Sequence, residues 1–220
     1  MRFTRDIRNT ILINSAGEKI GSVKDLIIDT STKFPKVLYI DAELDKTDRI
    51  GNVDFTEPAK KIRILIPWDQ IGSFRDYKEK KIKLKVHPHE IEMGALDYNK
   101  LLVGQHILDQ QILNHKNIGL GRVDDVVLIE DGDKLVMVGL CVGVSGILQQ
   151  LGFDFPVEII NKLLLLEEIK QDIIPWNYVL EYKPKKSQIK LRGKDTKDAL
   201  VKIVADNDEE AKKIVHKRKK

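Results

Sequence analysis

The side chains with the greatest potential for chemistry are scattered through the 220-residue chain. One local cluster, His87-Pro88-His89-Glu90, contains metal-ligand types. Its proline constrains the backbone, and it lacks the spacing that puts two histidines on one helix face, so we interpret it as a linker. None of Ser22, Ser145 and Ser187 lies in the Gly-x-Ser-x-Gly pattern of a nucleophile elbow. The sequence therefore predicts no catalytic residue, no metal site and no enzyme.

A glycine-rich run, Gly139–Gly146, is the nearest approach to a phosphate-binding loop. It lacks the Lys-Ser/Thr ending of a P-loop and the spacing of the dinucleotide fingerprint, which favours a strand that leads into a helix. We therefore predict no cofactor. The single cysteine, Cys141, stands among apolar residues and is predicted to be a buried small hydrophobic residue. A lone cysteine also excludes an internal disulfide framework.

The composition, 42% hydrophobic and 33% charged, is that of a globular protein. No apolar run approaches the roughly 18 residues of a membrane helix, and no apolar signal region follows Met1. We expect no membrane span and a cytoplasmic location.

The charge is divided unevenly along the chain. Residues 183–220 carry 14 Lys/Arg and 6 Asp/Glu, or +8, whereas residues 1–182 carry 24 and 28, or −4. A basic tail that ends Lys217, Arg218, Lys219, Lys220 suits an anionic partner such as RNA. The other interpretation, which we favour, is a solvated helix end whose cations complement the helix dipole.

An internal repeat organises the sequence. Ile20–Asp25 matches Leu120–Asp125, Ile66–Ile71 matches Ile174–Val179, and Ile82–Leu84 matches Ile189–Leu191, at offsets of 100, 108 and 107 residues. The matches occur in the same order, and the change of offset indicates a small insertion in the second copy. Two copies of one unit are the simplest account.

Each copy is predicted to be a string of short strands with turns between them and no regular helices. The polar stretch Asp45–Lys61 is predicted to be a loop. The predicted strands of the first copy are Thr10–Asn14, Ile20–Asp29, Val37–Ala42, Ile62–Ile66, Ile71–Phe74 and Lys81–Val86. Those of the second copy are Gln105–Asp109 or Gln111–Asn114, then Leu120–Glu130, Lys134–Val144, Ile173–Pro175, Val179–Tyr182 and Gln188–Leu191.

Two turns carry specific local signals. Asn14–Gly17 corresponds to Asn114–Asn117, and the last position is Gly in one copy and Asn in the other. These residue types enter the left-handed backbone region at the lowest cost, so the same turn is expected in both copies. Asp131-Gly132-Asp133 lies between two apolar runs and predicts a hairpin.

The residues that recur at matched positions are interpreted as structural. The glycines inside strand patterns indicate a bulge, a barrel corner or a close backbone approach. The aspartates are predicted to accept hydrogen bonds from turn amides, the prolines to lie at a strand start or edge, and the tryptophans to pack against a core. This structural signature consists of Gly21, Val23, Asp25, Pro67, Trp68, Gly121, Val123, Asp125, Pro175 and Trp176.

These motifs resemble the PRC-barrel family, named for the cytoplasmic β-barrel of the photosynthetic reaction centre H subunit. The carrying features are a Gly-x-Val-x-Asp strand, a second long strand, Ile-Pro-Trp and a closing Ile-x-Leu strand, over about residues 5–195. The duplication is similar to the paired barrels that precede MgtE-type and CBS domains in some bacterial proteins; neither of those domains fits into this chain. The resemblance implies a mainly β fold of two tandem small antiparallel barrels.

The expected boundaries are 5–95 for the first barrel, 98–194 for the second and 195–220 for a basic helical tail. The second barrel is expected to carry a helical insertion at about 145–170. The tail is expected to form short helices over Asp195–Val204 and Asn207–Lys217. The insertion presents a broad apolar face that should be buried against the barrels or a second subunit. Val157, Ile160, Leu163 and Leu164 on that face, together with the four basic residues at the end of the tail, form the candidate interaction surface.

We therefore expect a non-enzymatic intracellular interaction or regulatory module that binds a protein partner, with a homodimer as one form of it. Two alternatives remain at this point. One is an RNA- or ribosome-associated accessory protein that uses the basic tail. The other is a small-ligand carrier with a pocket between the barrels.

Overall fold

The computed structural model describes residues 1–51, 53–73, 80–94, 100–142, 172–183, 186–192 and 201–202, of which 46–49, 53–60, 73, 172 and 201–202 are described by their backbone alone. The described part of the chain is mainly β. It divides into two compact units: unit 1 is Met1–Gln105 with Glu130–Val136, and unit 2 is His106–Ile129 with Met137–Lys220. No helix in the described ranges is long and apolar enough to cross a membrane.

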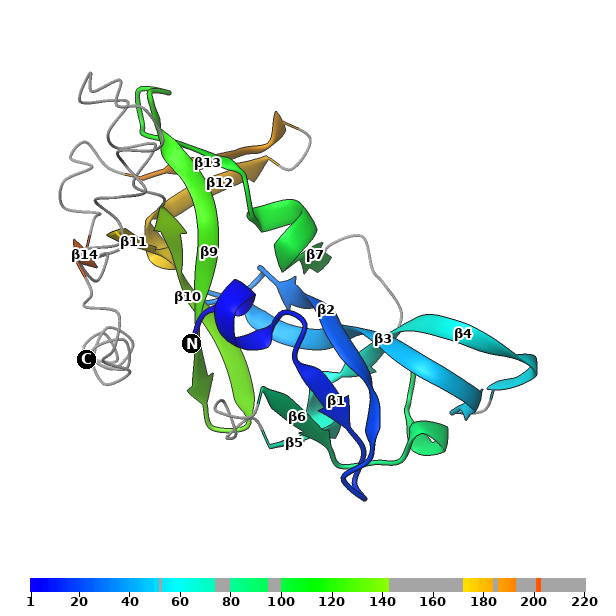
Figure 1. The fold of residues 1–220 in the computed structure, drawn as a ribbon. Helices are drawn as coiled ribbons and strands as arrows, with labels where there is room; N and C mark the ends of the chain where they lie inside the picture. The colour runs from blue at the N-terminus through cyan, green and yellow to red at the C-terminus, as the bar shows by residue number, and fades with distance from the viewer. Residues whose placement is uncertain are drawn as a thin grey trace, which may run out of the picture. The chain divides into compact units, whose positions relative to one another are not determined.

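Unit 1 is a sheet in the order β5-β6-β1-β2-β3-β4, with β7 also alongside β2 (Figure 1). All its neighbouring pairs are antiparallel except β1 and β6, which are parallel. The core consists of alternate apolar residues of these strands, including Leu12, Val23, Ile40, Ile66 and Leu84. The strands are β1 (Ile11–Ile13), β2 (Lys19–Asp29), β3 (Lys36–Ile50), β4 (Val53–Pro67), β5 (Ile71–Ser73), β6 (Lys81–Leu84) and β7 (Lys100–Leu102).

Unit 2 has the order β12-β13-β8-β9-β10-β11, with β14 paired to β11. β8 is antiparallel to β9 and parallel to β13. The strands are β8 (Gln111–Leu113), β9 (Gly119–Asp131), β10 (Lys134–Val142), β11 (Asp172–Pro175), β12 (Val179–Lys183), β13 (Gln188–Leu191) and β14 (Val201–Lys202). The first residues of β10 and the last of β9 belong to unit 1.

The two units use the same strand registers. Leu12 pairs with Gly21 and Ile82 in unit 1, and Ile112 pairs with Gly121 and Ile189 in unit 2. Likewise Ile40 pairs with Ile66, and Leu140 with Ile174. The sequence offsets therefore reappear as matched backbone pairings.

Short helical turns accompany the strands at corresponding places. η1 (Phe3–Ile7) and η4 (Val103–Ile107) precede β1 and β8, and η2 (Trp68–Gln70) and η5 (Trp176–Tyr178) follow β4 and β11. A further turn, η3 (Pro88–Glu90), follows β6. The predicted strand at Gln105–Asp109 is wrong, and its alternative at Gln111–Asn114 is confirmed as β8.

The predicted turns are confirmed. Gly17 and Asn117 have φ angles of 89° and 61°, in the left-handed region. The Asn14 side-chain oxygen accepts the N–H groups of Ala16 and Glu18 at 3.0 and 2.9 Å. The oxygen of Asn114 does the same for residues 116 and 118, both at 2.9 Å. Gly132, with φ of 67°, turns the chain between β9 and β10.

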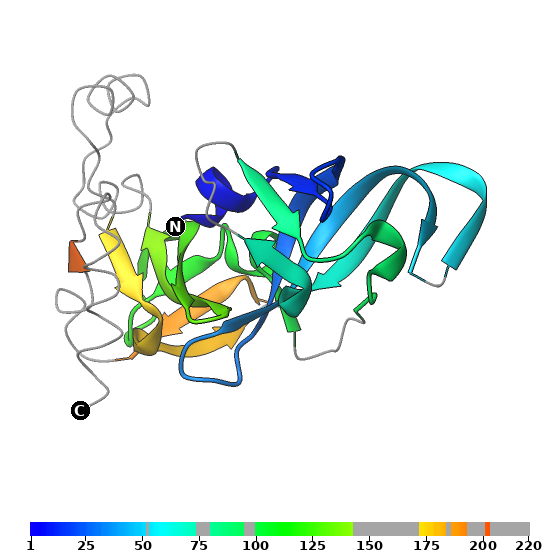
Figure 2. The same cartoon turned by 90° about the horizontal axis from the view of Figure 1, so that it is seen from below.

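The predicted loop Asp45–Lys61 is wrong, because this stretch belongs to the β3–β4 hairpin. The hairpin continues past β2, as Figures 1 and 2 show from two directions. Ile50 pairs with Val53 at its end, and Ile50 is fully buried. The missed signal was Gly51-Asn52 between two β-branched residues, a two-residue hairpin sequence.

Closed barrels are not seen among the described residues. The strand order of unit 1 starts at β5 and that of unit 2 at β12, and neither strand pairs back onto the other end of its sheet. The parallel pair in each unit also departs from the predicted antiparallel arrangement. The predicted helix Asp195–Val204 is wrong at Val201–Lys202, whose backbone pairs with β11 instead. The predicted insertion helix and the helix Asn207–Lys217 lie outside the described residues.

Gly21→Ala tests the contact that fixes the β2–β3 spacing. A Cβ at Gly21 would lie 2.2 Å from the Glu43 carbonyl oxygen. We expect a loss of about 1–3 kcal/mol in the free energy of unfolding, measured by urea denaturation, because backbone has to move. Gly119→Ala is the control, since its Cβ would meet only the end of the Gln111 side chain, at 3.0 Å. Equal losses in both variants would contradict this.

Candidate functional site

The two signature aspartates are buried and hydrogen-bonded to the backbone. Asp25 in β2 is 5% exposed and Asp125 in β9 is 6% exposed. The Asp25 Oδ1 atom accepts the N–H groups of Leu26 and Gly104, each at 2.7 Å. The Asp125 Oδ1 atom accepts the N–H of Val126 at 2.7 Å. Each carboxylate therefore holds backbone amides in place.

Asp25 has a second carboxylate as its neighbour. Asp41 in β3 is opposite Asp25 in the strand register and is 3% exposed. Burial raises the pKa of Asp25, and the Asp41 carboxylate raises it further, while the N–H groups of Gly104 and Leu26 oppose the rise. Two like charges directly opposite in a sheet destabilise it unless a cation compensates them.

The compensating cation is Arg63 of β4. Its Nε donates to both Asp41 oxygens, at 2.7 and 3.0 Å, and one terminal nitrogen also donates to Oδ2. This two-pronged geometry is the strong form of a guanidinium–carboxylate pair. Asp41 raises the pKa of Arg63 by this hydrogen bond. The guanidinium is therefore a fixed positive group.

Further ion pairs continue along the same face of β3. The Glu43 carboxylate accepts a hydrogen bond from Lys61 Nζ at 2.7 Å and lies 3.2 Å from Lys24 Nζ. The Asp45 carboxylate lies 3.4 Å from Lys19 Nζ. The acids alternate with core residues along β3, so they share the face away from the core. Surface pairs of this kind contribute little stability, but they neutralise the acidic row.

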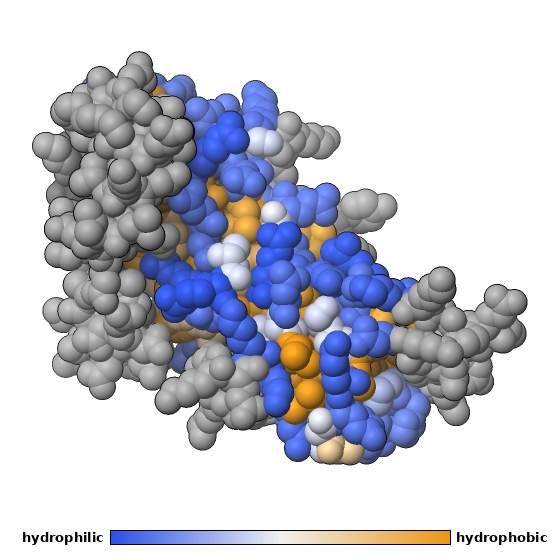
Figure 3. Space-filling model, in the orientation of Figure 1, coloured by the Kyte–Doolittle hydropathy of each residue, from blue (hydrophilic) through white to orange (hydrophobic). Residues whose placement is uncertain are grey.

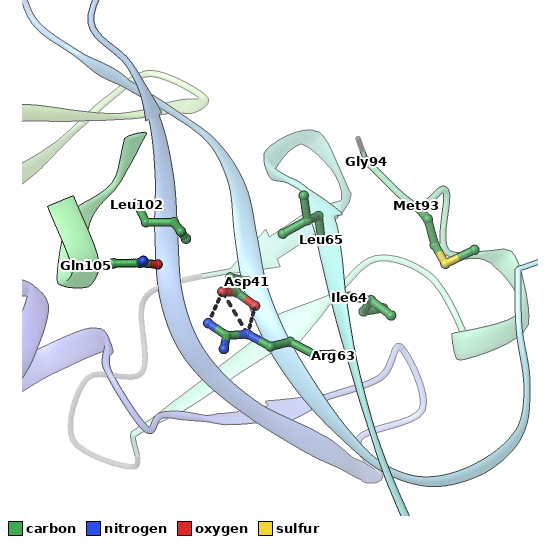
Figure 4. Close-up of a pocket in the computed structure, with 8 residues that line it drawn as sticks. All are labelled: Asp41, Arg63, Ile64, Leu65, Met93, Gly94, Leu102 and Gln105. Atoms are coloured by element: carbon green, nitrogen blue, oxygen red, sulfur yellow. Dashed lines mark hydrogen bonds and ion pairs between the residues drawn. The ribbon is translucent and has the colours of Figure 1, made fainter. Parts of the chain in front are cut away.

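A cavity of about 460 Å³ lies beside the Asp41–Arg63 pair, within unit 1 (Figure 4). Figure 4 shows Leu102 and Gln105 on one side of the pair, and Leu65, Met93 and Gly94 on the other. Most of the cavity wall is therefore apolar, and its polar side chains are those of the Asp41–Arg63 pair and Gln105. Its volume is in the range of small-ligand sites.

The two signature tryptophans differ in their environment. Trp176 is 8% exposed and belongs to the core of unit 2. Trp68 is only partly buried, and its indole N–H donates to the Asp133 carbonyl at 2.9 Å. The prolines before them, Pro67 and Pro175, are the last residues of β4 and β11, so neither starts a strand. Among the described strands β4 pairs with β3 alone, so Pro67 lies on an edge strand, which is the other predicted position.

Trp68 lines a groove of about 600 Å³ in unit 1. The groove also contains Tyr39 and Met93, and lysines and acids stand along it: Lys36, Lys85, Lys134, Asp69, Glu92 and Asp133. Met93 is 48% exposed and lines the cavity as well as the groove. On the face seen in Figure 3, apolar residues are visible in small areas among hydrophilic ones.

The other predicted site residues fall into two groups. Val23 and Val123 are fully buried, Gly21 lies against β3, and Gly121 has a φ of 137° that favours glycine. The candidate interaction surface, Val157, Ile160, Leu163, Leu164, Lys217, Arg218, Lys219 and Lys220, lies outside the described residues. In the described ranges no three His, Cys, Asp or Glu side chains gather as metal ligands would, and His87 stacks on His89 with ring centres 5.7 Å apart.

Sequence reasoning missed the Asp41–Arg63 pair. A signal was present, since Asp41 is the single charge in the predicted strand Val37–Ala42 and Arg63 the single charge in Ile62–Ile66. A buried charge needs a partner, so two lone charges in two apolar strands indicate a pair.

A family model described as the PRC-barrel domain matches residues 1–92. A PRC-barrel domain is detected in this chain. The match covers the β1–β6 segment, Asp25, Asp41, Arg63 and Trp68, so both the cavity and the groove use residues of the PRC-barrel domain. A comparison with curated proteins found no match.

Asp25→Asn tests the buried carboxylate through pH. A pKa raised in the folded state means that ionised Asp25 lowers stability above that pKa and that protonation removes the penalty below it. We expect the variant to be more stable than the parent at pH 7, with the difference shrinking as pH falls through the folded pKa toward 3.8. Urea denaturation across that range measures it. Asp25→Ala should instead lose about 1–3 kcal/mol, because two amides lose their acceptor. A pH-independent difference between the Asn variant and the parent would contradict the account.

Proposed function

We propose that this protein is a non-enzymatic, cytoplasmic interaction module built from two PRC-type barrel domains, and that the first domain binds a protein partner in the groove at Trp68. The matched strand registers of the two units support the duplication. An architectural role is supported for those signature residues that lie in backbone contacts or in the core: Val23, Asp25, Val123, Asp125 and Trp176. The domain limits 5–95 and 98–194 are part of this proposal.

The observation that carries the proposal is the contrast between Trp68 and Trp176. The same position of the two units holds a core tryptophan in one and a groove-lining tryptophan in the other. Unit 2 indicates that the fold accommodates this side chain in its core. Partly exposed tryptophan beside tyrosine and methionine is the composition of binding hot spots rather than of ordinary surface.

The groove favours an extended protein segment as the partner. Its aromatic and methionine side chains suit an apolar anchor residue, and the Asp133 carbonyl keeps the Trp68 ring in a fixed orientation. Both lysines and acids line it, so the flanking residues of the partner would carry both signs of charge.

The other functions stay predictions. RNA binding depends on the basic tail, and residues 193–200 and 203–220 lie outside the described ones. A homodimer through the insertion depends on residues 143–171, which also lie outside them.

Quantitative pull-down from the native cell tests the groove. Trp68→Ala in the tagged full chain should reduce recovery of the specific partner by about tenfold or more, because a central hot spot contributes 2 kcal/mol or more. Leu180→Ala is the matched control, because it also removes a large exposed apolar side chain, 52% exposed, but from unit 2. Recovery unchanged by Trp68→Ala, or lost equally in both variants, would contradict the proposal.

Thermal unfolding of the same variants separates binding from folding. Trp176→Ala should cost about 3–5 kcal/mol, as for other buried aromatic residues. Trp68→Ala should cost much less, because its ring is only partly buried.

A further inference from the structure

We propose that the cavity beside Asp41 and Arg63 binds a carboxylate with an apolar tail, and that Arg63 is the residue that recognises the carboxylate. This site is separate in its chemistry from the Trp68 groove and does not depend on a protein partner. It lies within unit 1, between β3, β4, the Met93–Gly94 segment, and Leu102 and Gln105.

The charge that a ligand meets in this cavity is positive. The side chain of Asp41 is 5% exposed, whereas that of Arg63 is 62% exposed. In the Lys61–Glu43 pair the cation is again the more exposed partner, with side-chain exposures of 61% for Lys61 and 27% for Glu43. The acids are therefore more buried than their cations, and an incoming group reaches the guanidinium first.

Hydrogen bonds to Asp41 fix the orientation of the Arg63 guanidinium before a ligand binds. Nε and one terminal nitrogen donate to the Asp41 carboxylate, and among the described residues no hydrogen bond uses the other terminal nitrogen, Nη1. A guanidinium has five N–H donors in a rigid plane, so the outer donors keep a defined direction. Because the side chain is already ordered, binding costs little additional conformational entropy.

The donors that remain suit a single carboxylate on the ligand. Asp41 already accepts from Nε and one terminal nitrogen, so the guanidinium presents only its outer donors, which match one carboxylate group better than the several oxygens of a phosphate. Gln105 is the other polar side chain at the cavity, and its amide can donate to a carboxylate oxygen. Leu65, Leu102 and Met93 supply apolar walls for a hydrocarbon tail.

The fold itself does not require this ion pair. In unit 2 the position that corresponds to Asp41 is Cys141, which is fully buried. Cys141 pairs with Ile173 in the sheet, just as Asp41 pairs with Leu65 in unit 1. The same strand register is therefore formed with an apolar residue. Burying the carboxylate of Asp41 is costly, and unit 2 has no carboxylate at this position, which calls for a role of Asp41 other than folding.

The test is a titration of the ¹⁵N-labelled full chain followed by NMR, with hexanoate as the probe. We expect saturable shifts of the Arg63 Nε–H, the Gln105 side-chain amide and the Gly94 amide. Hexan-1-ol and hexylamine, at equal ionic strength, serve as the uncharged and the cationic probe of the same tail length. Each should bind about tenfold or more weakly than hexanoate, as expected for loss of a charge-assisted hydrogen bond.

Variants assign the effect to Arg63. Arg63→Lys keeps the charge but removes the fork, and should weaken hexanoate binding about tenfold. Asp41→Asn with Arg63→Met avoids an unpaired buried charge and should abolish it, whereas Lys61→Met should leave it within about twofold. Equal binding of hexanol, preference for hexylamine, no saturable shift with hexanoate, or unchanged affinity in Arg63→Lys would each overturn the proposal. Loss of the partner in Trp68→Ala bears only on the groove, so the two proposals fail separately.

Discussion

Each unit depends on a parallel pairing between an early strand and one about 70 residues later. Ile11–Ile13 pair with Lys81–Lys83, and Gln111–Leu113 pair with Gln188–Lys190. Bringing such distant segments together costs chain entropy. The cost is offset by apolar side chains at the centre of each pairing, since Leu12, Ile112 and Ile189 are fully buried and Ile82 nearly so. The order of the remaining strands follows from this pairing, because β1 and β8 also pair with the long strands β2 and β9.

Comparison of the two units distinguishes residues that the fold needs from residues that are present in unit 1 for another role. Positions with the same residue type in both, such as Asp25 and Asp125, make contacts to the backbone. Positions that differ in type or exposure, such as Asp41 against Cys141 and Trp68 against Trp176, line the cavity and the groove of unit 1. An internal second copy serves here as the reference that shows which side chains the fold needs. Both candidate sites use residues of the segment matched as a PRC-barrel domain, together with residues of unit 1 beyond it.

The sequence predicted best the features with local causes. Asn14 and Asn114 fix their turns by side-chain hydrogen bonds within four residues, and Gly132 marks a hairpin, so both were readable. The β3–β4 extension was missed because its polar residues lack apolar alternation, although Gly51-Asn52 marks its turn. The Asp41–Arg63 pair was missed too: two lone charges in apolar strands indicate a pair, but only the strand register shows that residues 22 positions apart meet. Whether Trp68 would be in a core or in a groove depends on packing that periodicity does not contain.

The central claim is that Gly21, Gly121 and Trp176 hold the fold, while Trp68 and Arg63 are present for binding. A substitution scan of the full chain, scored for the amount of folded protein, tests it most directly. The account predicts severe losses at Gly21, Gly121 and Trp176 and tolerance of most substitutions at Trp68; Arg63 is scanned in the Asp41→Asn background, where no buried carboxylate loses its cation, and should tolerate most substitutions there. If Trp68 and Arg63 were as intolerant as Trp176, they would be structural residues, and the claim would be wrong.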